Sequence, residues 1–223
     1  MVDWLGMNIV QLLRILIVAS ILSLSALHAM AGEQDDVTYQ ALVGRVKGGD
    51  LSIDFRSLRL ACIRSNLCEP RGTKADLALM NRAVADHEPR SVVEVAERLI
   101  EKGYVNMEAH ATAVQAYTQL NESAKAKFHL DVTVALLRSI MSSGDGKSKE
   151  SAFEVICDRE EYYMLTTLGL PYLGSEVASA HVVQDGPHTY DRWEVRNPKT
   201  GQNVVVFFNT DQFSTTKSRV SDK

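Results

Sequence analysis

The sequence contains few of the residues that mark several specialised protein classes. Among 223 residues there are five prolines, thirteen glycines and three cysteines, and aromatic residues make up 7%. This composition excludes collagen-like and low-complexity chains and argues against a strongly aromatic all-β sandwich. The 24 basic and 28 acidic residues leave a net charge of −4. The chain therefore lacks the basic surface that nucleic acid requires, and we expect no nucleic acid partner.

Apolar residues are plentiful, at 45% of the chain. This fraction and this length suffice for a packed core, in one ordinary domain or two small ones. Disorder is excluded as the main state of the chain. The composition therefore indicates a globular protein of mixed secondary structure.

The first 31 residues have the pattern of a signal peptide. An apolar stretch over residues 15–31 follows Arg14 and ends in the sequence Ala-Met-Ala at Ala31, which predicts cleavage after that residue. A retained membrane anchor is the alternative, but the stretch is shorter than the roughly 20 residues of a spanning helix and contains serines. Translation from Met1 and translation from Met7 give the same mature protein. We expect a periplasmic or secreted protein that meets the membrane only during export.

The middle of the chain carries four amphipathic helical patterns separated by short breaks, which favour antiparallel neighbours. A 34-residue offset aligns small and apolar positions between them, the period of tetratricopeptide hairpins. A generic helical bundle is the alternative. The four predicted helices are Lys74–Ala85, Pro89–Lys102, Glu108–Leu120 and Glu122–Ser143.

Two shorter helices are predicted before this region. Residues 36–47 carry an apolar stripe that ends at a glycine pair, and Asp54 can cap a helix over residues 55–65. In the second helix Arg56, Arg59 and Arg64 are predicted to point away from the apolar face.

In the last third of the chain the periodicity changes to that of strands. Residues 152–157 are predicted as a buried strand, and Asp158 with Glu161 as the capping box of a short helix. Residues 177–184 and 189–196 form a predicted hairpin, and residues 203–209, apolar on both faces, a central strand.

These patterns predict an α+β fold in which N-terminal tetratricopeptide-like helical hairpins pack on a small, mostly antiparallel C-terminal sheet. The expected organisation is a signal peptide (1–31), N-terminal helices and a loop (32–73), the tetratricopeptide-like region (74–150), the α+β sheet region (151–212) and a flexible tail (213–223).

His110 and His129 are candidates for acid-base or metal chemistry because they lie on paired helices. With a hairpin turn near Glu122, His110 lies opposite position 134, so the rings are offset by about five residues, or roughly 7.5 Å along the helix axes. This offset disfavours a direct contact. Each is predicted to be a buried core histidine, and a pocket that both face through different partners stays open.

Asp145 and Lys147 form a second candidate, a ligand-facing corner after the long helix. The sequence around them ends like a phosphate-binding loop, but the first glycine of that motif is replaced by Met141 and the order of strand and helix is reversed. We therefore reject nucleotide binding and favour an ordered turn.

Glu160 and Glu161 are paired carboxylates, which the helix dipole alone explains. Tyr190 lies on the predicted hairpin, where an aromatic residue usually stiffens a sheet. The sequence has no signature of a hydrolase nucleophile or a zinc protease and no metal-ligand spacing. No metal and no cofactor are expected.

The three cysteines are interpreted in the light of export, because disulfides persist in oxidising compartments. Cys62 and Cys68 lie on either side of a predicted helix end, so a bridge between them and two free thiols are both open. Cys157 follows an apolar run and is predicted to be a buried, unreactive side chain.

Several short motifs occur in an order that resembles an uncharacterised family of exported bacterial proteins, known only as a domain of unknown function. The resemblance covers residues 39–209 and implies tetratricopeptide-type helices followed by a small sheet. It implies no activity, cofactor or catalytic residue. The family has tyrosines where this chain has Cys68 and Arg71, which makes a bridge from Cys62 to Cys68 more credible. The motifs are DFRSLR (54–59), EAH (108–110), AKFH (126–129), SGDGKS (143–148), EEY (160–162), YD (190–191), PKTG (198–201) and FFN (207–209).

Two functional hypotheses remain. The first is a scaffold that binds a peptide or an envelope protein in a groove of the helical hairpins. The second is a hydrolase-like enzyme whose site forms where His129, Asp145 and Glu161 converge. The first is preferred because the sequence lacks a catalytic signature.

Overall fold

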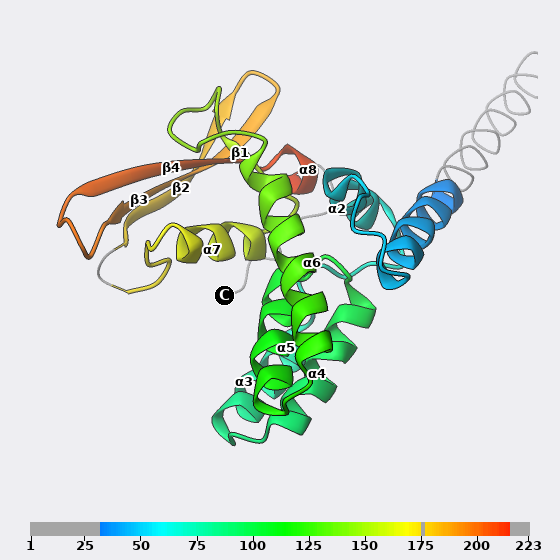
Figure 1. Ribbon diagram of the computed structural model, residues 1–223. Coiled ribbons are helices and arrows are strands. Elements are labelled where there is room, and N and C mark those ends of the chain that lie inside the picture. Colours follow the sequence, from blue (N-terminus) through cyan, green and yellow to red (C-terminus); the bar gives the residue numbers. More distant parts are fainter. Residues whose placement is uncertain (1–31, 175–176, 215–223) are drawn as a thin grey trace, which may run out of the picture.

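The computed structural model describes residues 32–174 and 177–214. The predicted signal peptide and residues 215–223 of the predicted tail lie outside the described residues. Helices make up the first part of the described chain and a sheet the last part (Figure 1). The α+β class is therefore confirmed.

A helix over residues 32–47 comes first. The elements that follow are α2 (Phe55–Arg64), α3 (Lys74–Ala85), α4 (Pro89–Lys102), α5 (Met107–Gln119), α6 (Ser123–Met141), β1 (Phe153–Glu154), α7 (Asp158–Thr167), β2 (Val177–Asp185), β3 (His188–Arg196), β4 (Asn203–Asn209) and α8 (Asp211–Ser214).

Helices α3 to α6 occupy the predicted ranges to within two residues, and local chemistry explains where they begin. Thr73 and Asp76 form a reciprocal capping box at α3, Pro89 occupies the first turn of α4, and the Asn106 side chain caps α5. The connections are too short to cross the bundle, so consecutive helices pack as neighbours.

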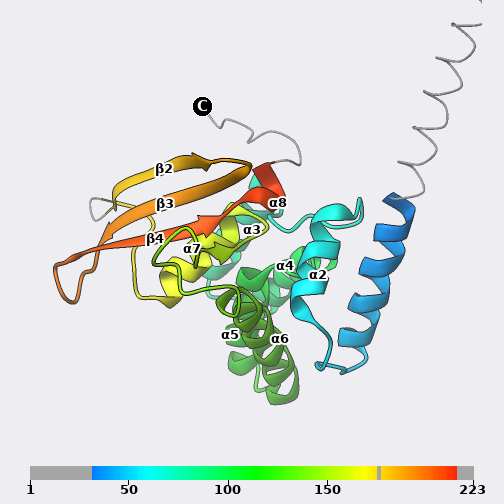
Figure 2. The ribbon, with the colours of Figure 1, turned by 90° about the horizontal axis from the view of Figure 1, so that it is seen from above.

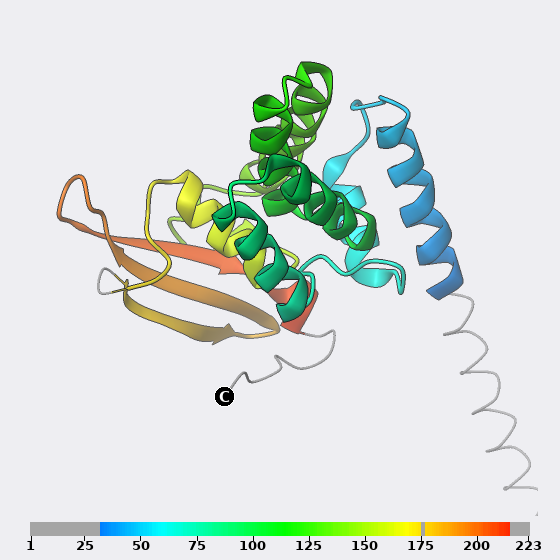
Figure 3. The same cartoon turned by 90° about the horizontal axis from the view of Figure 1, so that it is seen from below.

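Helix 32–47 lies beside α2 at the edge of the helical part (Figures 2 and 3). Its described part includes four residues before the predicted start, and it ends at the predicted glycine pair, where Gly49 has a φ of +90°. The Ser65 hydroxyl after α2 donates a hydrogen bond of 2.7 Å to Asp36. This contact joins the two helices at Asp36.

The sheet has four strands in the order β1-β4-β3-β2. Strand β4 is central, as its apolar sequence predicts. It pairs antiparallel with β3 and parallel with β1, and β2 pairs antiparallel with β3. The strand predicted over residues 152–157 is too long, because Ile156 donates its backbone N–H to the Glu160 carboxylate and not to a strand.

Arg59 contradicts the prediction that it points away from the core. Its guanidinium is 1% exposed. Its Nε donates to Glu160 at 2.8 Å, and Nη2 donates to the backbone carbonyl of Glu154 at 2.7 Å. A long arginine on the flank of an apolar face can turn inward when a buried carboxylate receives it. The pair joins α2 to β1 and α7, and so joins helices to sheet.

Helix α7 lies across one face of the sheet (Figure 2). The capping box predicted at its start is absent. Cys157 occupies the N-cap position without a side-chain hydrogen bond, and Glu161 is turned inward, where it accepts a 2.8 Å hydrogen bond from Trp193 Nε1 on β3. Glu161 therefore binds Trp193 from a distant strand in place of the backbone at the start of its own helix.

The predicted flexible tail begins too early at residue 213. Phe213 is part of α8, and its side chain is 6% exposed within the hydrophobic core. Burial of a phenylalanine is worth roughly 2 kcal/mol, which is enough to hold this short helix against the molecule.

Candidate functional site

His110 on α5 and His129 on α6 are in direct contact, contrary to the sequence-based expectation. Their Nδ1 atoms are 2.9 Å apart. The expected axial offset counts only the two backbones, whereas both imidazoles extend into the space between the helices and meet there. His110 is fully buried and His129 is nearly so.

The partners of His110 fix its protonation. Its Nε2 lies 2.9 Å from the Tyr104 carbonyl oxygen, which can only accept, so Nε2 carries a proton. Burial lowers the pKa of His110 to about 4. The ring is therefore neutral at pH 7, its Nδ1 is an acceptor, and the proton in the contact between the histidines belongs to His129.

The other nitrogen of His129 faces Glu97 of α4. Its Nε2 is 3.1 Å from Glu97 Oε1, which also accepts a 2.8 Å hydrogen bond from the Tyr117 hydroxyl. The contact with His129 lowers the pKa of Glu97. A continuous hydrogen-bonded chain thus joins α4, α6 and α5 and ends at the Tyr104 backbone. Its inner end is the Tyr104 carbonyl group, and its outer end is the Glu97 carboxylate with the Tyr117 hydroxyl.

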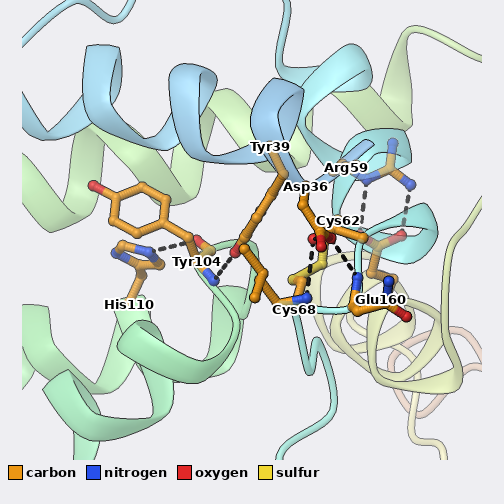
Figure 4. The surroundings of a disulfide bond; sticks show 11 residues. Asp36, Tyr39, Arg59, Cys62, Cys68, Tyr104, His110 and Glu160 are labelled. Carbon is orange, nitrogen blue, oxygen red and sulfur yellow. Dashed lines mark hydrogen bonds and ion pairs between the residues drawn. A yellow bond between two sulfur atoms is a disulfide. The ribbon is translucent and has the colours of Figure 1, made fainter. Parts of the chain in front are cut away.

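Tyr104 is held from two directions. Its carbonyl accepts from His110, and its N–H donates 3.0 Å to the hydroxyl of Tyr39 on helix 32–47. Figure 4 shows the Tyr104 ring beneath that helix, with its hydroxyl directed away from the disulfide. The ring is buried, and its hydroxyl has no hydrogen-bond partner in the described part of the chain. Burial raises the pKa of Tyr104 well above the usual phenol value.

An open cleft of about 410 Å³ lies against Tyr104, between helix 32–47 and the end of α4. Its lining combines apolar side chains with two tyrosines, one cation and one anion, and we call it the Tyr104 groove. The lining residues are Tyr39, Gln40, Val43, Gly44, Lys47, Leu67, Ile100, Glu101 and Tyr104.

The loop after α2 contributes one wall of the groove through Leu67. A disulfide joins Cys62 in α2 to Cys68, with their Cα atoms 5.2 Å apart, and closes this loop (Figure 4). The Glu69 N–H then bonds to the Lys102 carbonyl at 2.8 Å. At Gly103 a Cβ would lie 2.3 Å from the Glu69 carbonyl oxygen, so only glycine permits this approach.

Asp145 and Lys147 form an exposed corner. Asp145 accepts a hydrogen bond from Ser151 and pairs with Lys147 at 3.0 Å, and these contacts lower the pKa of Asp145 to about 2. Gly146 packs so closely on Phe153 that a Cβ would lie 2.5 Å from the ring. The segment is an ordered turn that satisfies its own charges.

The two adjacent glutamates have separate structural partners. Glu160 pairs with Arg59, and Glu161 pairs with Trp193, with burial raising the pKa of Glu161 well above that of an ordinary carboxyl group. Tyr190 is buried in β3, where it pairs with Asn209 and Val183 in the register of the sheet.

His129, Asp145 and Glu161 do not form the hydrolase-like site that was one of the two hypotheses. His129 contacts α4 and α5, Asp145 contacts Ser151 and Lys147, and Glu161 contacts β3. Twelve residues of α6 separate His129 from the helix end at Met141, a rise of about 18 Å before the Asp145 turn begins. The three side chains belong to three different environments.

Sequence reasoning missed most of the groove. Tyr39 and Lys47 on one wall are at least 54 positions in sequence from Glu101 and Tyr104 on the other, and no local spacing relates them. Gly103 does mark a close approach of the backbone in the structure, but a lone glycine does not specify a ligand.

Among residues 32–174 and 177–214 there is no cluster of three metal-ligating side chains, and no helix there is both long and apolar enough to cross a bilayer. The fold and the groove thus define an α+β protein with a cleft between helices in the described part of the chain.

The chain belongs to the family described as domain of unknown function (DUF4919), whose model matches residues 64–219. No curated protein and no solved structure matches it. The matched region includes the α4 side of the Tyr104 groove, whereas helix 32–47 precedes it.

Proposed function

We propose that this protein is an exported module that binds a peptide or a segment of an envelope protein in the Tyr104 groove. The observation that carries the proposal is the groove itself. A cleft of about 410 Å³ lies within the usual size range of ligand sites. Its mixture of apolar and polar side chains suits a peptide, which presents both kinds of group.

The rigidity of the groove supports binding. Its floor residue, Tyr104, is fixed by hydrogen bonds from helix 32–47 and α5, and its loop wall is closed by the disulfide. A site whose walls are already positioned loses little conformational entropy when a ligand enters.

The disulfide also supports the proposed export, because such bonds persist outside the reducing cytosol. The consecutive packing of α3 to α6 supports a tetratricopeptide-like arrangement of the helices. Fractionation of cells expressing the full chain tests the location: the processed protein is expected in the periplasm or medium, and an intact precursor in the cytosol contradicts it.

Gly44→Phe tests peptide binding. Gly44 lines the groove, and a Cβ at this position has no neighbour within 4 Å, so the aromatic ring can fill the cleft without displacing the core. Ala41→Phe on the same helix is the matched control, because residue 41 is exposed and outside the groove lining.

Peptides enriched from a displayed random library on the wild-type protein would be synthesised and their affinities measured by fluorescence anisotropy. We expect Gly44→Phe to weaken binding at least about tenfold, a loss of about 1.4 kcal/mol, and Ala41→Phe to retain it. Failure of the library to enrich any peptide, or equal binding by Gly44→Phe, contradicts the proposal.

A further inference from the structure

Two opposite charges that form no ion pair with the described residues line the Tyr104 groove. Lys47 comes from helix 32–47 and Glu101 from α4, and both are exposed. Within the described part of the chain neither takes part in an ion pair. This contrasts with nearby Arg45, which pairs with Asp50 at 2.6 Å, and Lys102, which pairs with Asp76 at 2.8 Å.

Lys47 is also positioned by the floor of the groove. Its Nζ lies over the Tyr104 ring, 5.6 Å from the centroid, where the negative face of the ring attracts a cation. Among the described residues, the buried Tyr104 hydroxyl has no hydrogen-bond partner. A buried polar group without a partner is costly and calls for an explanation. A ligand in the cleft would lie beside Tyr104, which is one of the lining residues.

Apolar side chains occupy the space between these charged groups. Val43 and Ile100 belong to the packed core or contact it, and Leu67 is 46% exposed. A ligand that fits such a site has a negative group for Lys47 and Tyr104, a positive group for Glu101, and an apolar part between them.

We infer that the Tyr104 groove binds a short peptide by both of its free termini, with the carboxylate at Lys47 and the Tyr104 hydroxyl and the ammonium group at Glu101. An apolar side chain of the peptide packs on Val43, Leu67 and Ile100. This assignment rests on the proposed function and names its ligand class. Charged groups on the ligand that match both walls fix its direction in the groove.

The test uses alanyl-leucyl-alanine and two derivatives, the N-acetylated and the C-amidated tripeptides, with the mature full-length protein. Binding is followed by NMR shift changes during titration. The free tripeptide is expected to shift the amide signals of residues 39–47 and 100–104. Each blocked derivative is expected to bind about fivefold more weakly, as befits the loss of one partly exposed ion pair.

Two variants test which side chain binds each terminus of the peptide. Lys47→Gln is expected to weaken the free tripeptide and to leave the amidated one unaffected. Glu101→Gln is expected to weaken the free tripeptide and to leave the acetylated one unaffected. Arg45→Gln is the matched control, because Arg45 lies on the same helix and its charge is used by Asp50. Both substituted residues are exposed, so the fold is not at risk.

The outcomes separate this inference from the proposed function. Equal affinity for the free, acetylated and amidated tripeptides overturns recognition of the termini, even if longer library peptides still bind in a way that Gly44→Phe abolishes. The inference is also overturned if Lys47→Gln and Glu101→Gln both weaken binding while the affinity does not depend on whether the peptide's termini are free or blocked. NMR shift changes confined to residues outside the groove would show that the tripeptide does not bind in the Tyr104 groove.

Discussion

At the residue scale, buried charges join parts of the chain that are far apart in sequence. Arg59 and Glu160 are 101 positions apart and almost fully buried. Glu160 also accepts the Ile156 N–H at 2.9 Å, but this neutral donor does not compensate the carboxylate charge as Arg59 does. The intact pair therefore adds little net stability, but removal of one partner leaves the other as an uncompensated buried charge, which is costly.

Replacing Arg59 with methionine is expected to destabilise the protein by about 3 kcal/mol, because Glu160 is left as an unpaired buried charge. Urea unfolding measures the change. Arg56→Met is the control: Arg56 lies one turn away in α2 and pairs with Glu154, but its side chain is 51% exposed, so we expect a loss within about 1 kcal/mol. Equal losses in the two variants contradict this account.

His110 provides a prediction of pH dependence. Its pKa of about 4 in the folded protein lies below the ordinary histidine value of 6.5, so between these values the unfolded chain binds more protons. Stability is therefore present above pH 6.5 and is lost as the pH falls toward 4, by about 3 kcal/mol in full. The groups facing His110 are His129, the Tyr104 carbonyl and, through His129, Glu97.

Long-range proton–nitrogen NMR is expected to show His110 as the neutral tautomer protonated at Nε2 at pH 7. His110→Asn is expected to be less stable at pH 7 and to have a flatter stability profile between pH 6.5 and 4. A protonated His110 at pH 6 is the result that would contradict the assignment.

At the scale of elements, local sequence signals determine where the helices begin and end, whereas the shape of the groove depends on how separate segments pack. Helix 32–47 contains Gly44, which has no neighbour to make its small size necessary. Gly103, directly after α4, has the Glu69 carbonyl against it. The same residue type therefore has opposite roles at the two walls of the groove.

Gly44→Ala is expected to stabilise the protein by about 0.5–1 kcal/mol, because alanine loses less backbone entropy in a helix than glycine does. Gly103→Ala is expected to destabilise it by about 1–3 kcal/mol through overpacking against the backbone. Thermal or urea unfolding of both variants measures whether each substitution raises or lowers the free energy of unfolding. A stable Gly103→Ala protein would show that the loop wall is not fixed there.

At the scale of the whole molecule, the buried Arg59–Glu160 pair holds α2 to the rest of the fold, and the disulfide closes the short loop after α2. The bridge closes a short loop that carries Leu67 into the groove, and α2 is joined to α7 by Arg59. The ten-residue helix α2 thus carries both Cys62, which anchors the loop wall of the groove, and Arg59, which joins the helices to the sheet.

The oxidised mature protein is expected to show no thiol that reacts with a maleimide when folded and one when unfolded. The remaining thiol is Cys157, which is buried and whose pKa burial raises to about 12. The double variant Cys62→Ala/Cys68→Ala is expected to lose about 2 kcal/mol of stability, given the small loop. Three thiols after unfolding without reductant contradict the bridge.

Much of the secondary structure could be predicted because its signals are local. The ranges of α3 and α4 follow from caps, proline and apolar periodicity, and the central place of β4 follows from a strand apolar on both faces. Errors occurred where a distant partner outweighed a local preference. Glu161 left its capping position for Trp193, and Arg59 turned inward to Glu160.

The sequence alone determined the class of fold, the positions of most helices and strands, and the family, because caps, turns and periodic apolar faces act over a few residues. Only the tertiary structure decided that His110 meets His129, that the candidate hydrolase residues lie apart, and that Lys47, Glu101 and Tyr104 line one cleft. These outcomes depend on how separate helices pack against one another, and side chains from different elements have no shared spacing along the chain.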